Sequence, residues 1–176
     1  GPVSPTGTNT DTTDPGSGSV IVYDEVILTG ESTSNDTIEP VAPGGVPISV
    51  PDNVIAVGVI RSTSTTVGGS AGVAFTTLFD TWRFLANGRA GTVTLTETSG
   101  ESLSSGTPGA RRLTAALTSG VLHIYASGEV DEIINWSLSV EMQRIYATNE
   151  SEFEDAILTE AGARLAGIND RVLLQE

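Results

Sequence analysis

The clearest pattern in the chain is a strict alternation of apolar and polar residues over the segment 134–143. Apolar residues occupy every second position, at Ile134, Trp136, Leu138, Val140 and Met142. The positions between them are polar, at Asn135, Ser137, Ser139, Glu141 and Gln143. Because successive side chains of a strand point to opposite faces, a period of two is typical of a β-strand. We therefore predict a half-buried strand over 134–145, with one dry face and one face toward solvent or a partner.

Other segments also have the composition of strands. The segments 20–28, 113–117 and 121–126 are short, mostly apolar and bounded by polar or turn-forming residues, which predicts one strand in each. The segment 54–60, VIAVGVI, is almost continuously apolar. Such a run is typical of a strand that is buried on both faces or lies at an interface.

A β-hairpin is predicted near the middle of the chain. Apolar residues alternate in the second half of the segment 74–86, at Trp82, Phe84 and Ala86. The pair Asn87-Gly88 follows, and both residues tolerate the positive φ of a type I′ turn. The segment 91–97 then pairs back, with its apolar residues, Val93 and Leu95, directed inward.

Segments rich in Gly, Pro, Ser and Thr separate these strands. The segments 29–37, 61–72 and 98–112 predict turns and loops, and the Pro-rich segment 40–51 predicts an extended connection. Strands joined by short turns, with no helical pattern between them, favour antiparallel pairing. The prediction is an all-β fold, an antiparallel, jelly-roll-like β-sandwich, over residues 20–148.

Two extensions flank the predicted sandwich. Residues 1–19 contain almost nothing apolar and predict a flexible arm or linker. Residues 149–176 form a C-terminal tail that we expect to serve oligomerisation or attachment. In this tail, Gly residues favour short strands over a helix that a capping box at Ser151 would begin. Gly1-Pro2 resembles the scar of a removed tag, which leaves open whether natural residues precede Val3.

Composition narrows the classes of partner. The 22 acidic residues outnumber the 8 basic ones, and the net charge is −14. Such a surface repels phosphate backbones and lacks the basic stripe that binds anionic lipids, so we expect neither nucleic acid nor membrane insertion. The chain has no Cys, which excludes disulfides, thiolate metal sites and Cys nucleophiles. We predict no cofactor and no metal.

Catalytic motifs are weak in this sequence. Residues 68–72, GGSAG, match the G-x-S-x-G nucleophile elbow around Ser70, but that motif needs a strand before it and a helix after it. A triad would have to use His123, the single His of the chain, with Asp80 or Asp131 as its orienting carboxylate. A packed strand residue is the favoured interpretation of His123. We therefore predict no catalytic residues and no enzymatic activity.

The aromatic residues offer a possible platform for sugars. Trp82 and Trp136 are in phase with the apolar faces of their strands, which favours core packing. The tyrosines are not tied to a core pattern in this way. Among them, Tyr125 and Tyr146 are the predicted glycan-binding residues.

The second half of the chain, about residues 74–176, resembles virion β-sandwich proteins of tailed bacteriophages. The resemblance rests on Trp82, the Asn87-Gly88 hairpin, the segment 127–145 (SGEVDEIINWSLSVEMQRI) and the tail 156–176 (AILTEAGARLAGINDRVLLQE). Ile133 stands where such proteins more often have Thr or a small residue. The resemblance implies a particle component of the tail-fibre, head-fibre, spike or decoration type, often trimeric and sometimes host-binding, with no active site.

The expected function is accordingly a non-enzymatic structural role in a bacteriophage particle, with a contribution to attachment at the host surface. The expected partners are further copies of the chain, as a homotrimer, other virion proteins, and a host cell-surface glycan. The expected location is the extracellular particle. The alternatives are a carbohydrate-binding module and a bacterial surface adhesin domain.

Overall fold

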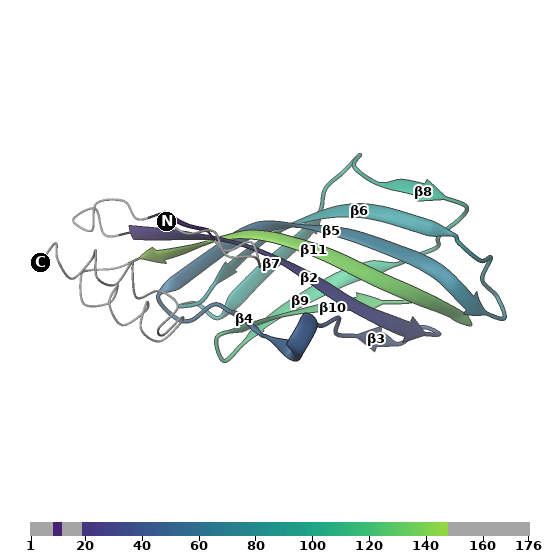
Figure 1. Cartoon of the computed structure of the whole chain (residues 1–176), viewed down its shortest axis with the longest axis horizontal. Helices are drawn as coiled ribbons and strands as arrows, with labels where there is room; N and C mark the ends of the chain where they lie inside the picture. The colour runs from purple at the N-terminus through teal and green to yellow at the C-terminus, as the bar shows by residue number, and fades with distance from the viewer. Residues whose placement is uncertain (1–8, 12–18, 148–176) are drawn as a thin grey trace, which may run out of the picture.

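The chain folds into two antiparallel β-sheets (Figure 1). The structure, a computed structural model, describes residues 9–11 and 19–147. The larger sheet has seven strands in the order β1-β2-β11-β5-β6-β7, and β8 also pairs with β6. Its strands are β1 (Asn9–Asp11), β2 (Ser19–Thr33), β5 (Val54–Gly69), β6 (Thr77–Asn87), β7 (Thr92–Glu97), β8 (Leu103–Ser105) and β11 (Glu132–Ala147).

The smaller sheet has four strands, in which β10 pairs with each of the other three. Its strands are β3 (Thr37–Ile38), β4 (Ile48–Ser49), β9 (Arg112–Thr118) and β10 (Val121–Ser127). A short 3-10 turn, η2 (Pro43–Gly45), lies between β3 and β4. The predicted all-β fold with antiparallel pairing is confirmed, and the predicted strands 113–117 and 121–126 correspond to β9 and β10. The jelly-roll description stays a prediction.

Strand β11 is the centre of the larger sheet. It pairs along its length with β2 on one side and with β5 on the other. Its inward side chains are almost completely buried, at Ile134, Trp136, Leu138 and Val140. The prediction of a half-buried strand over 134–145 is confirmed, and the strand is longer by two residues at each end.

Apolar side chains from both sheets form one core. Ile60 and Leu138 of the larger sheet belong to the same buried cluster as Leu122 and Ile124 of β10. Burial of each such side chain contributes roughly 1.5–3 kcal/mol. Trp136 also belongs to this cluster, and its indole N–H donates to Ser32 Oγ at 2.9 Å, so its polar atom is satisfied inside the protein.

Strand β5 confirms the predicted strand over 54–60 but differs from the predictions of its burial and of the loop after it. The predicted loop 61–72 is wrong, because β5 continues to Gly69. The predicted burial of 54–60 on both faces is also wrong within this chain, since Val57 and Val59 point outward and are half-buried. The inward positions of the second half are Ser62, Ser64 and Thr66, which are buried although they are polar.

Strand β2 is also longer than its apolar segment. It was predicted over 20–28, followed by a turn-rich segment, but it runs on to Thr33. Pairing with β11 extends over the added residues, up to Thr33 opposite Ile133. The chain turns at Ser34, which has φ of 59°. Tertiary pairing therefore outweighs the local turn propensity of this segment.

The hairpin of β6 and β7 is confirmed, but its turn type is wrong. Asn87 pairs with Thr92, so the loop runs from Gly88 to Gly91 instead of being a two-residue type I′ turn. The positive φ belongs to Gly91, at 68°. Gly88 is needed for another reason: a Cβ there would lie 1.7 Å from the carbonyl oxygen of Pro51. Val93 and Leu95 pack against the core as predicted.

Parts of both predicted extensions lie outside the described residues. Within the predicted arm, β1 (Asn9–Asp11) pairs with β2 opposite residues 21–23. Residues 1–8, 12–18 and 148–176 are not described, so the predictions of strands and of an oligomerisation or attachment role for the tail are untested. No helix in the described part of the chain is long and apolar enough to span a membrane.

Candidate functional site

The residues of the weak nucleophile motif do not form a nucleophile elbow. Ser70 lies in a bend directly after β5. The next regular element is β6, a strand, whereas the elbow requires a helix whose N-terminus stabilises the reacting group. The local geometry that would activate Ser70 is therefore not built.

The residues of the conceivable triad have separate partners. His123 Nδ1 lies 2.6 Å from Glu39 Oε1, so the carboxylate that contacts this ring is neither Asp80 nor Asp131. Asp80 is buried in β6 and accepts a hydrogen bond from Ser102 Oγ. Asp131 lies in the turn before β11, where its backbone N–H donates to Ser34 Oγ at 3.2 Å. The described residues also contain no group of three or more His, Cys, Asp or Glu placed to hold a metal ion.

The two tyrosines predicted to bind glycan are not on one surface. Tyr146 is only 1% exposed and belongs to the core, so its ring is not available for stacking against a sugar. Tyr125 is half-buried on β10 and stacks on His123, with 6.2 Å between ring centroids and an interplanar angle of 14°. Trp82 and Trp136 are buried in the core, as predicted from their phase. A glycan-binding role for Tyr125 stays a prediction.

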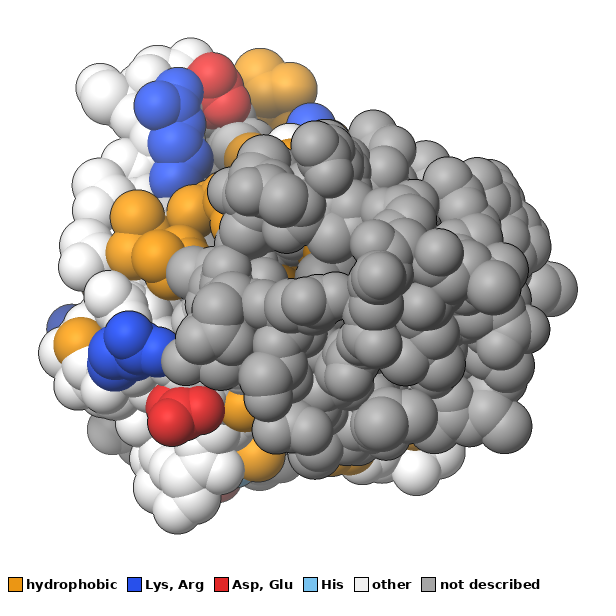
Figure 2. Space-filling view, turned by 90° about the vertical axis from the view of Figure 1, so that its left-hand side faces the viewer, with side chains coloured by type: hydrophobic (Ala, Val, Ile, Leu, Met, Phe, Trp, Pro, Cys, Tyr) orange, Lys and Arg blue, Asp and Glu red, His pale blue; other side chains and the backbone are white. Residues whose placement is uncertain are grey.

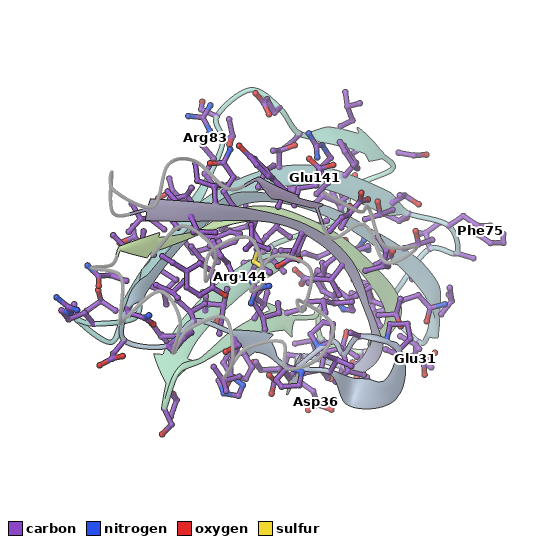
Figure 3. All side chains as sticks on the ribbon, turned by 60° about the vertical axis from the view of Figure 1, so that its left-hand side comes forward. Glu31, Asp36, Phe75, Arg83, Glu141 and Arg144 are labelled. Atoms are coloured by element: carbon purple, nitrogen blue, oxygen red, sulfur yellow. The ribbon has the colours of Figure 1, made fainter. Side chains whose placement is uncertain are left out.

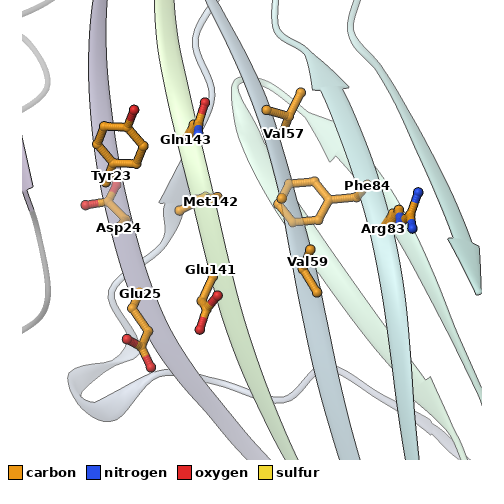
Figure 4. Close-up of a pocket in the computed structure, with 11 residues that line it drawn as sticks. Tyr23, Asp24, Glu25, Val57, Val59, Arg83, Phe84, Glu141, Met142 and Gln143 are labelled. Atoms are coloured by element: carbon orange, nitrogen blue, oxygen red, sulfur yellow. The ribbon is translucent and has the colours of Figure 1, made fainter. Parts of the chain in front are cut away.

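A groove crosses the outward face of the larger sheet (Figure 4). It has a volume of about 600 Å³. It crosses β2, β11, β5 and β6, and its lining comes from three neighbouring cross-strand rows of the sheet. The lining residues are Tyr23, Asp24, Glu25, Val57, Gly58, Val59, Arg83, Phe84, Glu141, Met142 and Gln143.

The floor of the groove is the middle row, in which Met142 lies opposite Asp24 on one side and Gly58 on the other. Phe84 continues the row beyond Gly58. Met142 and Phe84 are buried and Asp24 is mostly buried, in an ion pair with Arg144, so the floor presents backbone to the outside. A Cβ at Gly58 would lie 2.2 Å from the Glu141 carbonyl oxygen and 2.8 Å from the Phe84 ring. Gly58 therefore permits the close packing beneath the groove.

One wall of the groove combines an aromatic ring with apolar and amide groups. In the register, Gln143 lies opposite Tyr23 on one side and Val57 on the other. The Tyr23 residue is 36% exposed, and Val57 and Gln143 are half-buried. This wall offers a flat apolar surface with a polar hydroxyl at its edge.

The opposite wall carries the charges. Glu141 lies opposite Glu25 on β2 and opposite Val59 on β5, and Arg83 follows on β6. Like charges directly opposite each other in an antiparallel pair are unfavourable. Arg61 partly offsets this, since its Nη1 lies 3.0 Å from Glu141 Oε2 in an exposed ion pair. Arg83 and Glu141 lie on the outer side of the curved sheet, whereas Arg144 lies between the two sheets (Figure 3).

Sequence reasoning missed this groove because its residues come from strands far apart in the chain. The residues Tyr23, Glu25, Glu141 and Gln143 come together through the register of β2 with β11. The outward phase of Glu141 and Gln143 could be predicted from the alternation around them. Their pairing with Tyr23 and Glu25 could not, because nothing local fixes which strand lies beside β11.

Comparisons with known proteins give weak structural similarities. No family model matches the chain, and no curated protein matches it. The tailspike protein of Acinetobacter baumannii phage AM24 has a TM-score of 0.38 at 9% identity, over 71% of this chain and 26% of that one. A tailspike of A. baumannii bacteriophage Fri1, described as a capsular polysaccharide depolymerase, has a TM-score of 0.35 at 9% identity, over 76% of this chain and 19% of that one.

A pilus protein of Bacillus endospore appendages has a TM-score of 0.28 at 13% identity, over 80% of this chain and 99% of that one. The chain thus spans about a quarter or less of the length of the two tailspikes. Similarities at these TM-scores assign neither a family nor an activity to the chain.

Proposed function

We propose that the chain is a structural component of a bacteriophage particle, of the fibre, spike or decoration type, that contributes to attachment at a bacterial surface. The sequence resemblance of residues 74–176 to phage virion proteins supports the particle role. The role is one of display and contact, without catalysis.

The observation that carries the attachment role is the outward face of the larger sheet. Large apolar or aromatic residues are exposed on it, among them Tyr23 at 36%, Ile27 at 42% and Leu85 at 48%. They lie on the face that carries the groove, whereas the opposite face of the same strands is closed by the core. Exposed apolar surface rimmed by polar groups is typical of an interaction site.

The surface at the end of the molecule that lies on the left of Figure 1 also has a mixed chemistry. Hydrophobic, basic and acidic side chains lie interspersed there on the described residues (Figure 2). A mixed surface of this kind suits specific contacts better than a uniformly charged one, because polar groups fix the orientation while apolar groups supply the affinity. Attachment through this part of the molecule would therefore be selective.

The proposed particle component is a homotrimer that also contacts other virion proteins. Repeated copies would present several equivalent contact faces to one cell, and such multivalency raises the overall avidity without any new contact. Light scattering during size-exclusion chromatography tests this directly. A mass three times that of the chain is expected, and a monomer at micromolar concentration would contradict the trimer.

The attachment role is tested by co-sedimentation of the fluorescently labelled protein with a panel of bacterial strains. Selective binding to a subset of strains is expected, and the variant Leu85→Glu should reduce it because a charge then interrupts the outward face. The matched control is Val46→Glu, which places the same charge between η2 and β4, outside the larger sheet, at a residue that is already 66% exposed. Absence of binding to every strain, or equal loss in both variants, would contradict an attachment role for this face.

A further inference from the structure

We infer that the groove on the larger sheet binds a saccharide that carries no acidic groups, with Tyr23 as its stacking platform. The inference names the ligand class for the attachment role proposed above and rests on that role for its biological meaning. The site itself is argued from the groove alone. It differs from the site predicted from sequence at Tyr125 and Tyr146, which lie on other surfaces or in the core.

The size of the groove fits a small oligosaccharide. Binding sites for small molecules typically have volumes of roughly 300–1,000 Å³, and this groove has about 600 Å³. It crosses four neighbouring strands, so its walls are side chains on a rigid hydrogen-bonded sheet and not on loops. A rigid site of this kind loses little conformational entropy when a ligand binds.

The distribution of apolar and polar groups matches the two faces of a sugar ring. One face of a pyranose presents C–H groups, while its rim carries hydroxyls. The exposed ring of Tyr23 and the side chains of Val57 and Val59 supply apolar contacts inside the groove. An aromatic side chain gives a large flat contact at a small entropic cost, because it has few rotatable bonds.

Polar side chains lie on both walls beside these apolar groups. The carboxylates of Glu25 and Glu141 can only accept hydrogen bonds, and Arg83 can only donate them. Gln143 can do both. Sugar hydroxyls donate and accept, so they can satisfy such a set in a way that a purely apolar ligand cannot. Carboxylate acceptors also form stronger hydrogen bonds than neutral ones.

The opposed carboxylates support a ligand that supplies donors. Glu25 and Glu141 face each other across β2 and β11, an arrangement that costs stability. Departures from locally favourable pairing are expected where a residue serves function. Hydroxyl or amino donors placed between the two carboxylates would offset the repulsion.

The charge also selects against acidic saccharides. The chain has a net charge of −14, and two carboxylates stand on one wall of the groove. A uronic or sialic acid would bring a further negative charge to this wall, where Arg83 is the one basic residue of the groove lining and Arg61, outside the lining, is paired with Glu141. Like-charge juxtaposition of this kind suppresses binding of the wrong partner. Neutral and amino sugars are therefore the expected ligands.

The test is a glycan array probed with the full chain, followed by calorimetry with the best neutral or amino oligosaccharide and with an oligogalacturonate. Binding to the first and none to the second is expected. Tyr23→Ala should weaken binding by at least about tenfold, whereas Tyr23→Phe, which keeps the ring, should stay within about threefold of the wild type. Glu25→Gln should also weaken binding while it raises the urea midpoint, because it removes the repulsion with Glu141. A purely structural role for Glu25 would not give opposite changes in binding and stability.

The control variant is Leu103→Ala, on the exposed strand β8, which should bind like the wild type. Several results would overturn the inference: no binding to any neutral or amino glycan at millimolar concentration, binding of acidic glycans alone, or loss of binding in Tyr125→Ala with Tyr23→Ala unaffected. Dissociation of an oligomer by Tyr23→Ala would show instead that a second copy covers the groove.

If the chain binds cells but no such glycan, the saccharide inference fails and the attachment role stands. If it binds glycan but no cell, the attachment role fails alone.

Discussion

The two halves of β5 bury their inward faces with opposite chemistry. The first half directs Val54, Ala56 and Ile60 into the core, where each is at most 1% exposed. The second half directs Ser62, Ser64 and Thr66 inward, and each is at most 3% exposed. The backbone pairing with β11 and β6 continues through both halves. The same strand is therefore stabilised by apolar burial at one end and by hydrogen bonds at the other.

The polar half is organised around one buried Arg. The side chain of Arg111 has 0% exposure, and its guanidinium donates to the Ser64 carbonyl oxygen at 2.7 Å and to Thr66 Oγ1 at 2.5 Å. It also donates to the Thr76 carbonyl oxygen at 3.2 Å. Its Nη2 lies 3.6 Å from Glu132 Oε1, which in turn accepts a hydrogen bond from Thr66 Oγ1 at 2.8 Å. Burial lowers the pKa of Arg111, and the nearby Glu132 raises it, so the ion pair opposes the cost of burying the charge.

The largest expected effect comes from breaking the polar half. Arg111→Met should lower the free energy of unfolding by about 4 kcal/mol, because it leaves the hydroxyl, carbonyl and carboxylate partners buried without their donor. Urea unfolding followed by Trp fluorescence measures the loss. Arg112→Met, at the exposed neighbouring residue, is the matched control and should change stability by less than about 0.5 kcal/mol. Equal stability of the two variants would contradict a stabilising role for the Arg111 cluster.

This contrast explains what could be predicted from sequence. Alternation of apolar and polar residues identified β11, and the apolar first half of β5 was recognised as a strand. The second half, RSTSTTVGG, was predicted to be a loop because Ser and Thr at its inward positions give no apolar signal. Their partner, Arg111, lies more than 40 residues away in the chain. A buried polar face of a strand can be recognised from the sequence only when the residue that pairs with it, here Arg111, is known.

The same limit applies to the groove. The outward residues of β11 could be predicted, but the opposition of Glu25 to Glu141 depends on the register between β2 and β11. From the sequence, Tyr125 and Tyr146 are predicted to bind sugar only because they are aromatic and are not tied to a core pattern. The burial of Tyr146 follows from its inward phase at the end of β11, which lies past the regular alternation at 134–143.

The apolar half should respond to a cavity. Ile60→Ala should lower the free energy of unfolding by about 3 kcal/mol, because Ile60 is 0% exposed and its removed atoms leave a void in the core. The control is Val67→Ala, also on β5 but 42% exposed, which should cost less than about 1 kcal/mol. The two losses, measured in the same urea titrations, compare the halves directly. A loss for Ile60→Ala no larger than that for Val67→Ala would mean that the core does not stabilise this half.

The outward face should show a smaller effect of opposite sign. Glu25→Gln should raise the free energy of unfolding by about 0.5 kcal/mol at low salt, because it removes the like-charge opposition to Glu141. The gain should shrink in high salt, which screens exposed charges. Glu31→Gln, at an exposed residue opposite the neutral Asn135, is the control and should show a smaller gain. A loss of stability in Glu25→Gln would contradict the electrostatic account of this wall.

The smallest effect is a pH dependence at the end of β7. Partial desolvation of the carboxylate, a hydrogen bond with Asp80 and the Asp80 charge together raise the pKa of Glu97 above its ordinary value of 4.5. Because folding raises this pKa, the folded state binds the proton more tightly than the unfolded state. The contribution of Glu97 to the free energy of unfolding is therefore unfavourable near neutral pH. That cost disappears as the pH falls through the raised pKa toward 4.5.

Glu97→Gln should thus stabilise the protein near pH 7 and make no difference well below pH 4.5, where Glu97 is protonated in both the folded and the unfolded state. The gain should stay below about 0.5 kcal/mol because Glu97 is an exposed residue. Parallel urea midpoints of the wild type and the variant between these pH values measure the difference. A gain that grows as the pH falls would contradict the assigned direction of the shift.

The most direct test of the central claim, that the outward face of the larger sheet contacts ligand, is an amide NMR titration. The ¹⁵N-labelled chain is titrated with the neutral or amino oligosaccharide selected on the array. The predicted result is a set of saturating shift changes confined to residues 23–25, 57–59, 83–84 and 141–143, which line the groove. Shift changes centred on β9 and β10 around Tyr125, or none at saturating glycan, would contradict it.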